Sequence, residues 1–310
     1  MKHDFTLTLS FVLLVLISVG SCASPVLPPP LTPTPTLSQT PNSKTPTSTR
    51  TAAPSQTPVP SNTLTLTLAS SPSSTPTSTS DPAPWQEVGA GSASGGGISN
   101  NNGYSGPPSL EIAPNGTPYI AWMDDRSGNW EIYVQAWNGS SWAEVGAGSA
   151  SGGGISNNDG DSYLRSLAIA PDGTPYVAGA YYSSGNGEIY VRAWNGSSWA
   201  EVGAGSASGG GISNNTGYSH APSLAVAPDG TPYVAWQDES SGDSEIYVRA
   251  WDGSRWAEVG VGSASGGGIS NNIGYSYSPS LVLASDGTPY MAWYDDSSGN
   301  AEIYVRRFIE

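Results

Sequence analysis

Aspartate and tyrosine side chains that suit sugar binding recur at a fixed spacing in residues 85–310. They are Asp124, Asp238 and Asp295 together with Tyr104, Tyr218 and Tyr275, and a pair of asparagines lies near each set. Carboxylates and amides exchange hydrogen bonds with hydroxyl groups, and aromatic rings offer flat apolar surfaces. These residue types therefore suit carbohydrate recognition. The alternative is that these Gly-, Asn- and Ser-rich segments only turn corners, with tyrosine as packing.

The pattern is interrupted between residues 161 and 182. Gly179 stands where the other copies have tryptophan, Tyr181 and Tyr182 replace residues of the acidic loop, and Arg165 has no counterpart. Catalysis requires different groups in different roles, and this is the clearest break in the symmetry of the repeats. One hypothesis is a single modified pocket at Arg165, Tyr181 and Tyr182, with Gly179 leaving room where an indole would lie. Sequence drift is the alternative.

A second frame places oxygen-bearing side chains at alternate positions. It consists of Asp125, Ser127, Asn129 and Glu131, a spacing that can surround Ca²⁺. The frame lacks a glycine at its sixth position, and the next copy has Tyr182 in place of the first acid. A capped polar turn is the favoured interpretation, with Ca²⁺ as the alternative, and we expect no other cofactor.

Three arginines, Arg192, Arg249 and Arg306, each have a tyrosine two residues before and an aromatic residue two residues after. This spacing predicts cation–π packing between neighbouring sheets. A sialidase-like enzyme would need arginines from unlike positions, whereas these occupy one repeated position. A glycoside hydrolase or lyase would need paired acids, but the break in symmetry removes acids. We therefore expect no enzymatic activity and keep the propeller enzyme as the alternative.

The elements that position these residues follow from a repeat. Trp85, Trp142, Trp199 and Trp256 are 57 residues apart, and the sequence between them recurs. The third copy contains four short β-prone runs separated by turns, at residues 223–227, 231–236, 245–251 and 256–259. Four antiparallel strands in a repeat of this length are typical of a β-propeller blade.

The chain begins this domain with a fourth strand, Trp85–Val88, and ends with a third strand, Glu302–Phe308. The offset predicts an all-β propeller of four 57-residue repeats whose N-terminal strand closes the last blade. Two assemblies remain open: four blades that close alone, or a homodimer of eight blades. In either, the loops between blades and between the second and third strands share one face, which brings the recurring polar residues together.

The segments 113–122 (APNGTPYIAW) and 125–134 (DRSGNWEIYV) resemble the TolB-type (PD40, WD40-like) propeller repeat. The segment 137–142 (WNGSSW) is similar to repeats of propeller lectins. The resemblance implies a binding propeller, often for envelope proteins, without a catalytic motif. The insert at residues 205–221 departs from the family pattern and leaves the partner open between a glycan and an envelope protein.

Residues 1–24 have the layout of a secretory signal peptide, and the apolar run 9–19 is too short to span a bilayer. The run ending in Cys22 resembles a bacterial lipobox, which predicts lipidation of Cys22; cleavage after Ala23 is the alternative. Residues 25–84 are mostly Pro, Thr and Ser and predict a disordered stalk. We expect an extracytoplasmic protein at a bacterial cell surface, membrane-bound only through its lipid, or otherwise secreted.

Charge and cysteine content narrow the function further. The chain has 25 acidic and 10 basic residues, and residues 85–310 alone have a net charge of −16. Such a domain is repelled by phosphate backbones, so we expect no nucleic acid. One cysteine and two histidines exclude a disulfide framework and a Cys-based metal site. The sequence thus predicts a non-enzymatic binding module for glycans or envelope proteins, with a structural spacer as a further alternative.

Overall fold

The computed structural model describes residues 85–182 and 185–309. The predicted signal peptide, the lipidation residue Cys22 and the stalk lie outside the described residues. The described residues form β-strands joined by turns and loops, without a helix. This part of the chain accordingly has no helix of the length and apolarity that crossing a membrane requires.

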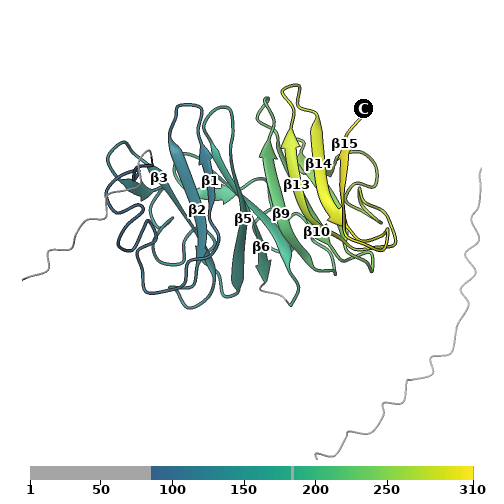
Figure 1. Cartoon of the computed structure of the whole chain (residues 1–310), viewed down its shortest axis with the longest axis horizontal. Coiled ribbons are helices and arrows are strands. Elements are labelled where there is room, and N and C mark those ends of the chain that lie inside the picture. Colours follow the sequence, from purple (N-terminus) through teal and green to yellow (C-terminus); the bar gives the residue numbers. More distant parts are fainter. Residues whose placement is uncertain (1–84, 183–184, 310) are drawn as a thin grey trace, which may run out of the picture. The chain divides into compact units, whose positions relative to one another are not determined.

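Within the described residues, fifteen strands form four antiparallel sheets, one for each repeat (Figure 1). Blade 1 contains β1 (Ser109–Ile112), β2 (Pro118–Asp124), β3 (Glu131–Trp137) and β4 (Trp142–Glu144). Blade 2 contains β5 (Asp161–Ile169), β6 (Pro175–Tyr182), β7 (Glu188–Trp194) and β8 (Trp199–Glu201). Blade 3 contains β9 (Ser219–Val226), β10 (Pro232–Asp238), β11 (Glu245–Trp251) and β12 (Trp256–Glu258). Blade 4 contains β13 (Ser276–Leu283), β14 (Pro289–Asp295) and β15 (Glu302–Arg307).

Within each blade the strands pair in chain order, as a meander. This confirms the predicted all-β architecture of four blades. Neighbouring blades contact each other through their first strands, β1 with β5, β5 with β9 and β9 with β13. The blades therefore follow each other in space as they do in sequence (Figure 1).

Short turns join the first and second strands of each blade. In blade 2 the side chain of Asp172 accepts a hydrogen bond from the backbone N–H of Thr174 at 2.9 Å. Gly173 between them has a φ of +90°, which glycine adopts without steric cost. Asp229 and Asp286 make the same bond in blades 3 and 4. The Asp-Gly pair of these turns thus fixes the hairpin and the strand register.

The core lies between blades. Ile246 and Val248 of β11 pack against Leu281, Met291 and Trp293 of blade 4, and all five are buried. Burial of each large apolar side chain contributes roughly 1.5–3 kcal/mol. Each blade therefore depends on the next for the cover of its apolar face.

The predicted closure by the N-terminal strand is not what the structure shows. Trp85–Val88 forms no strand, and the sheet of blade 4 has three strands within the described residues. Instead, the carbonyl of Val88 accepts a hydrogen bond from Trp142 Nε1 of blade 1 at 2.8 Å. This segment packs beside blade 1, whereas β15 belongs to the last blade of the series, so the two do not pair within the chain.

Candidate functional site

A buried aspartate lies at the end of the second strand in three of the four blades. In blade 3 the Asp238 carboxylate accepts hydrogen bonds from Asn215 Nδ2 at 2.7 Å, Ser219 Oγ at 2.8 Å and Trp236 Nε1 at 2.8 Å. The backbone N–H of Ser240 also donates to it, at 2.9 Å. We call this arrangement of aspartate, asparagine, serine and tryptophan the carboxylate cluster.

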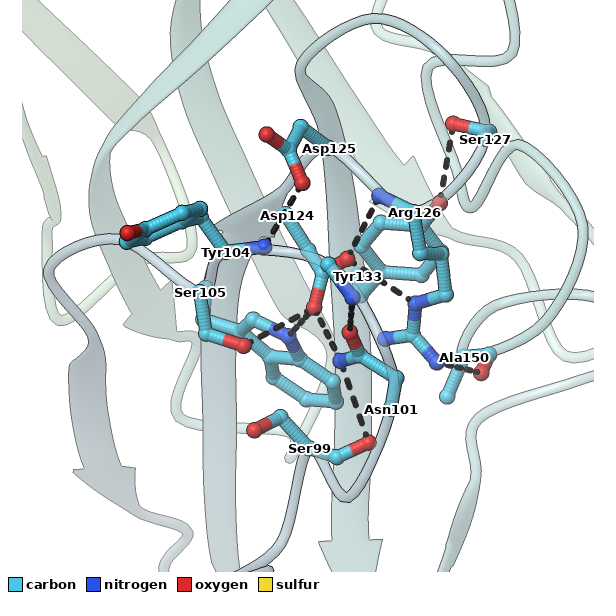
Figure 2. A network of polar contacts seen from close by, with 12 residues as sticks. Ser99, Asn101, Tyr104, Ser105, Asp124, Asp125, Arg126, Ser127, Tyr133 and Ala150 are labelled. Carbon is cyan, nitrogen blue, oxygen red and sulfur yellow. Dashed lines mark hydrogen bonds and ion pairs between the residues drawn. The ribbon is translucent and has the colours of Figure 1, made fainter. Parts of the chain in front are cut away.

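The same carboxylate cluster occurs in blades 1 and 4. Figure 2 shows the cluster of blade 1, where Asn101, Ser105 and the guanidinium of Arg126 surround Asp124. The members of the cluster of blade 4 are Asn272, Ser276, Trp293 and Asp295. Burial opposes the charge of Asp124 and Asp295, but the hydrogen bonds outweigh burial and lower the pKa of both carboxyl groups.

The cluster joins two loops that are far apart in sequence. Asn101 and Ser105 belong to the loop that precedes blade 1, whereas Asp124 ends β2. The predicted meeting of the inter-blade loop with the end of the second strand is therefore present. The three predicted aspartates are fully buried, however, and their oxygens bind donors of their own blade rather than facing solvent.

The three predicted tyrosines lie beside these clusters with exposed rings. The backbone N–H of Tyr104 donates to Asp125 Oδ1, and that of Tyr275 donates to Asp296 Oδ1, which fixes the loop but leaves the ring free to contact solvent. The Tyr218 ring contacts the Tyr182 ring with centroids 5.7 Å apart, and the Tyr275 ring stacks on the Tyr277 ring with centroids 6.1 Å apart.

Blade 2 lacks the carboxylate and the indole of the cluster. Tyr181 occupies the aspartate position and Gly179 the tryptophan position, while Asn158 and Ser162 keep theirs. Asn158 Nδ2 donates to Ser162 Oγ at 2.8 Å, whereas the corresponding bonds in blades 3 and 4, where the carboxylate is present, are 3.5 and 3.4 Å long. Two donors that serve the aspartate in the other blades thus remain in blade 2 without it.

A cavity of about 430 Å³ occupies this part of blade 2. Its lining includes Asn158, Ser162, Gly179, Tyr181, Tyr190 and Arg192. Its size falls within the range of small-molecule sites, about 300–1,000 Å³. Ile132 fills part of the space of the missing indole, since a Cβ on Gly179 would lie 2.7 Å from Ile132 Cδ1.

Arg192 lines this cavity because of the same exchange. In blades 3 and 4 the corresponding guanidinium groups of Arg249 and Arg306 lie over the rings of Trp236 and Trp293, 5.9 and 5.8 Å from the centroids. The predicted cation–π packing between neighbouring sheets is therefore wrong, because the contacts form within one blade, with the tryptophan of the second strand. In blade 2 this tryptophan is replaced by Gly179, so Arg192 has no indole ring at that position. Burial lowers the pKa of Arg192, which Glu201 opposes through its charge.

The structure brings together only some of the residues predicted for the modified pocket. Gly179 and Tyr181 line the cavity, and the Tyr181 ring contacts the Tyr190 ring with centroids 4.8 Å apart. Arg165 is exposed and is not among the lining residues, and Tyr182 lies in an aromatic cluster with Tyr163 and Tyr218.

Sequence reasoning did not identify Asn158, Ser162 and Arg192 as a set. Alignment of the four copies carries the signal, because the aspartate and tryptophan that contact these three positions elsewhere are both exchanged in copy two.

The proposed Ca²⁺ frame is occupied by hydrogen bonds. Asn129 Nδ2 donates to Glu131 Oε1 at 3.0 Å, and the backbone N–H of Asn158 donates to the same oxygen at 2.9 Å. Ser156 donates to the other carboxylate oxygen. Glu131 therefore clamps the loop that leads to blade 2, as a capped polar turn does. Residues 85–182 and 185–309 contain no group of three His, Cys, Asp or Glu side chains placed to hold a metal ion.

Comparison with known proteins gives no family. No family model matches the chain, and no curated protein matches it. The chain is similar in structure to an endo-arabinase from Bacteroides thetaiotaomicron (12% identity, 66% of this chain and 74% of that chain, TM-score 0.42). It is also similar to an α-L-arabinanase from Penicillium chrysogenum (16%, 66% and 62%, TM-score 0.43) and to a TolB-like protein from Agrobacterium tumefaciens (15%, 65% and 74%, TM-score 0.35). At these identities the similarity concerns the fold, and the TolB-type repeat remains a prediction.

Proposed function

We propose that this protein is a non-enzymatic binding module that holds a carboxylate-bearing saccharide in the cavity of blade 2. The observation that carries the proposal is the exchange of Asp and Trp for Tyr181 and Gly179, while Asn158 and Ser162 are retained. In the other blades these two positions donate to a buried carboxylate. A ligand carboxylate in the cavity would take the place of the missing aspartate.

Arg192 supplies the charge for this ligand. Charge-assisted hydrogen bonds between a guanidinium and a carboxylate are among the strongest in proteins, and a partly buried site increases their strength. The rings of Tyr181 and Tyr190 supply the flat surface against which a sugar ring packs. The cavity therefore combines the three elements of a site for an acidic sugar: cation, neutral donors and aromatic face.

A hydrolytic role fits the cavity less well. Glycoside hydrolysis generally uses two carboxyl groups on either side of the bond that is cleaved. The described residues that line the cavity include no Asp or Glu. We therefore favour binding without conversion, on a domain that the predicted stalk would display outside the cytoplasm.

The proposal is tested by calorimetric titration of the full chain carrying Cys22→Ser, which prevents lipidation. Glucuronic and galacturonic acids are compared with glucose and galactose, after a glycan array has been screened for larger acidic ligands. We expect the acids to bind at least about tenfold more tightly, and Arg192→Gln to remove most of this preference, because a hydrogen bond to a charged group contributes about 1.5–3 kcal/mol.

Arg165→Gln is the matched control, because Arg165 is exposed and outside the cavity lining. It should leave binding unchanged. Equal binding of acidic and neutral sugars, or equal losses in the two arginine variants, would contradict the proposal. Hydrolysis of an array ligand would instead favour the enzyme.

A further inference from the structure

The first and last blades expose residues that the inner blades bury. Ile303 on β15 is 75% exposed, whereas Ile246, one repeat earlier, is 0% exposed. Leu110 on β1 is 60% exposed, whereas Leu167, one repeat later, is 2% exposed. Each end of the blade series thus presents an apolar face. In the inner blades the corresponding face is covered by the neighbouring blade.

These two faces are the two halves of the contact between blades 3 and 4. On one side of that contact lie Ile246 and Val248, whose counterparts on blade 4 are the exposed Ile303 and Val305. On the other side lie Leu281 and Met291, whose counterparts on blade 1 are the exposed Leu110 and the half-buried Ile120; Trp122, the counterpart of Trp293, is already buried in the single chain. The exposed face of blade 4 and the exposed face of blade 1 therefore carry apolar side chains at the positions that pack together between blades 3 and 4.

A hydrogen bond repeated between the blades matches the same pairing. Ser109 Oγ accepts from the backbone N–H of Leu167 at 3.1 Å, and Ser223 Oγ accepts from that of Leu281 at 3.0 Å. The next serine in this series is the exposed Ser280 of blade 4, and the corresponding leucine is Leu110 of blade 1.

The segment Trp85–Val88 already has the position of an outer strand beside blade 1. Its Val88 carbonyl accepts from Trp142 Nε1 at 2.8 Å, as Val202 accepts from Trp256 at 2.9 Å. Gly89 lies beneath the Trp137 ring, where a Cβ would come within 2.3 Å of it. Blade 1 already has its own fourth strand, β4. The segment Trp85–Val88 therefore lies where the fourth strand of a preceding blade would lie, without the other three strands of that blade.

Blade 4 has the complementary lack, because β15 ends its sheet within the described residues. In blade 3 the corresponding strand pairs Trp251 with Trp256 and Arg249 with Glu258. Moved by one repeat, this register places Phe308 opposite Trp85 and Arg306 opposite Glu87. An aromatic pair and a pair of opposite charges are thus retained at both positions.

We propose that a second copy of this chain packs its blade 1 against blade 4 of the first, and that Trp85–Val88 of each copy becomes the fourth strand of the other's last blade. Two such contacts, related by a twofold axis, join two copies into a ring of eight blades, which is within the range of known propellers. No end face and no unpaired β15 edge then remains exposed.

Sedimentation velocity of the full Cys22→Ser chain tests the assembly. We expect a species of twice the chain mass of 31.8 kDa. Ile303→Glu with Val305→Glu should convert it to monomer, because two charges would enter the apolar contact, while circular dichroism remains unchanged since both side chains are exposed in the single chain. Ile273→Glu is the control and should remain dimeric, because this exposed loop position is polar in the other three copies.

A cysteine pair at Gln86 and Arg307 distinguishes closure between copies from closure within one chain. These positions face each other in the proposed register. Oxidised Gln86→Cys/Arg307→Cys protein should run as a covalent dimer on non-reducing gels, and a mixture of the two single variants should give the mixed dimer. An internal disulfide, a monomeric parent chain or a series of larger head-to-tail assemblies would overturn the eight-bladed ring.

Discussion

Blades 2 and 3 share their strands and turns but differ at the end of the second strand. In blade 3 Asp238 and Trp236 complete a buried cluster in which every named donor reaches the carboxylate. In blade 2 Tyr181 and Gly179 replace both residues, and a cavity of about 430 Å³ lies against the remaining donors. The comparison teaches that one structural polar cluster becomes a candidate binding site when its acceptor is removed and its donors are kept.

The physical reason is the cost of burying polar groups without partners. A buried donor or acceptor that loses its partner costs about 1–3 kcal/mol, whereas a satisfied polar network is rigid and specific. Three blades use the network to fix loops. Blade 2 keeps the two donors without the aspartate, and a ligand carboxylate there could accept from the Ser162 hydroxyl and from Asn158 Nδ2, which now donates to Ser162 Oγ.

Among substitutions that test this difference between blades, Asp238→Ala is expected to have the largest effect on stability. The substitution leaves the donors of Asn215, Ser219 and Trp236 without their acceptor, so the free energy of unfolding should fall by about 3 kcal/mol. Urea unfolding measures it. Asp229→Ala, at an exposed turn, is the control and should cost about 1 kcal/mol or less. Equal costs would show that the cluster has no special role in stability.

The next largest effect is expected from acidification, which protonates the buried aspartate of the carboxylate cluster. Burial opposes the charge of Asp295, but hydrogen bonds from Ser276, Ser297 and Asn272 outweigh it and lower the pKa to about 2 from its ordinary 3.8. Because the pKa is lower in the folded state, the stabilisation is present above about pH 4 and is lost as the pH falls toward about 2, an effect of about 2 kcal/mol.

Urea unfolding at several pH values across this window tests the prediction. The Asp295→Asn variant should be less stable at neutral pH and should lose less stability on acidification than the parent chain. If the stability of the two proteins depended on pH in the same way, protonation of Asp295 would not account for the loss of stability in acid.

The smallest effect on stability, but the most direct on the site, is expected from Tyr181→Asp. The new carboxylate would accept from Ser162 and Asn158, so the free energy of unfolding should rise by about 1 kcal/mol. Affinity for an acidic saccharide should fall by at least about tenfold, because the ligand carboxylate would meet a charge of its own sign. Tyr104→Asp, at an exposed ring, should change neither quantity. Unchanged affinity in the Tyr181→Asp variant would show that the saccharide does not bind in this cavity.

Much of the fold followed from periodicity, because each strand in a blade is a local pattern bounded by turn residues. The hairpins between the first and second strands and the four sheets appear where the 57-residue repeat predicts them. The predicted pairing of Trp85–Val88 with blade 4 does not appear, because the partner of this segment depends on which blade lies beside it. Within the candidate site, Gly179 and Tyr181 were predictable as exchanged residues, whereas the position of Arg165 outside the cavity was not.

The sequence alone determined the repeat, the strand content, the acidic domain without lysine and the exceptional nature of copy two. These properties depend on residue type and spacing, which local backbone preferences convert into strands and turns. Only the tertiary structure decided that the recurring aspartates are buried acceptors, that Arg192 rather than Arg165 lines the cavity, and that the two end faces are exposed. Those outcomes depend on which side chains of different strands and loops meet, and hydrogen-bond geometry and apolar packing settle such contacts only once the blades are assembled.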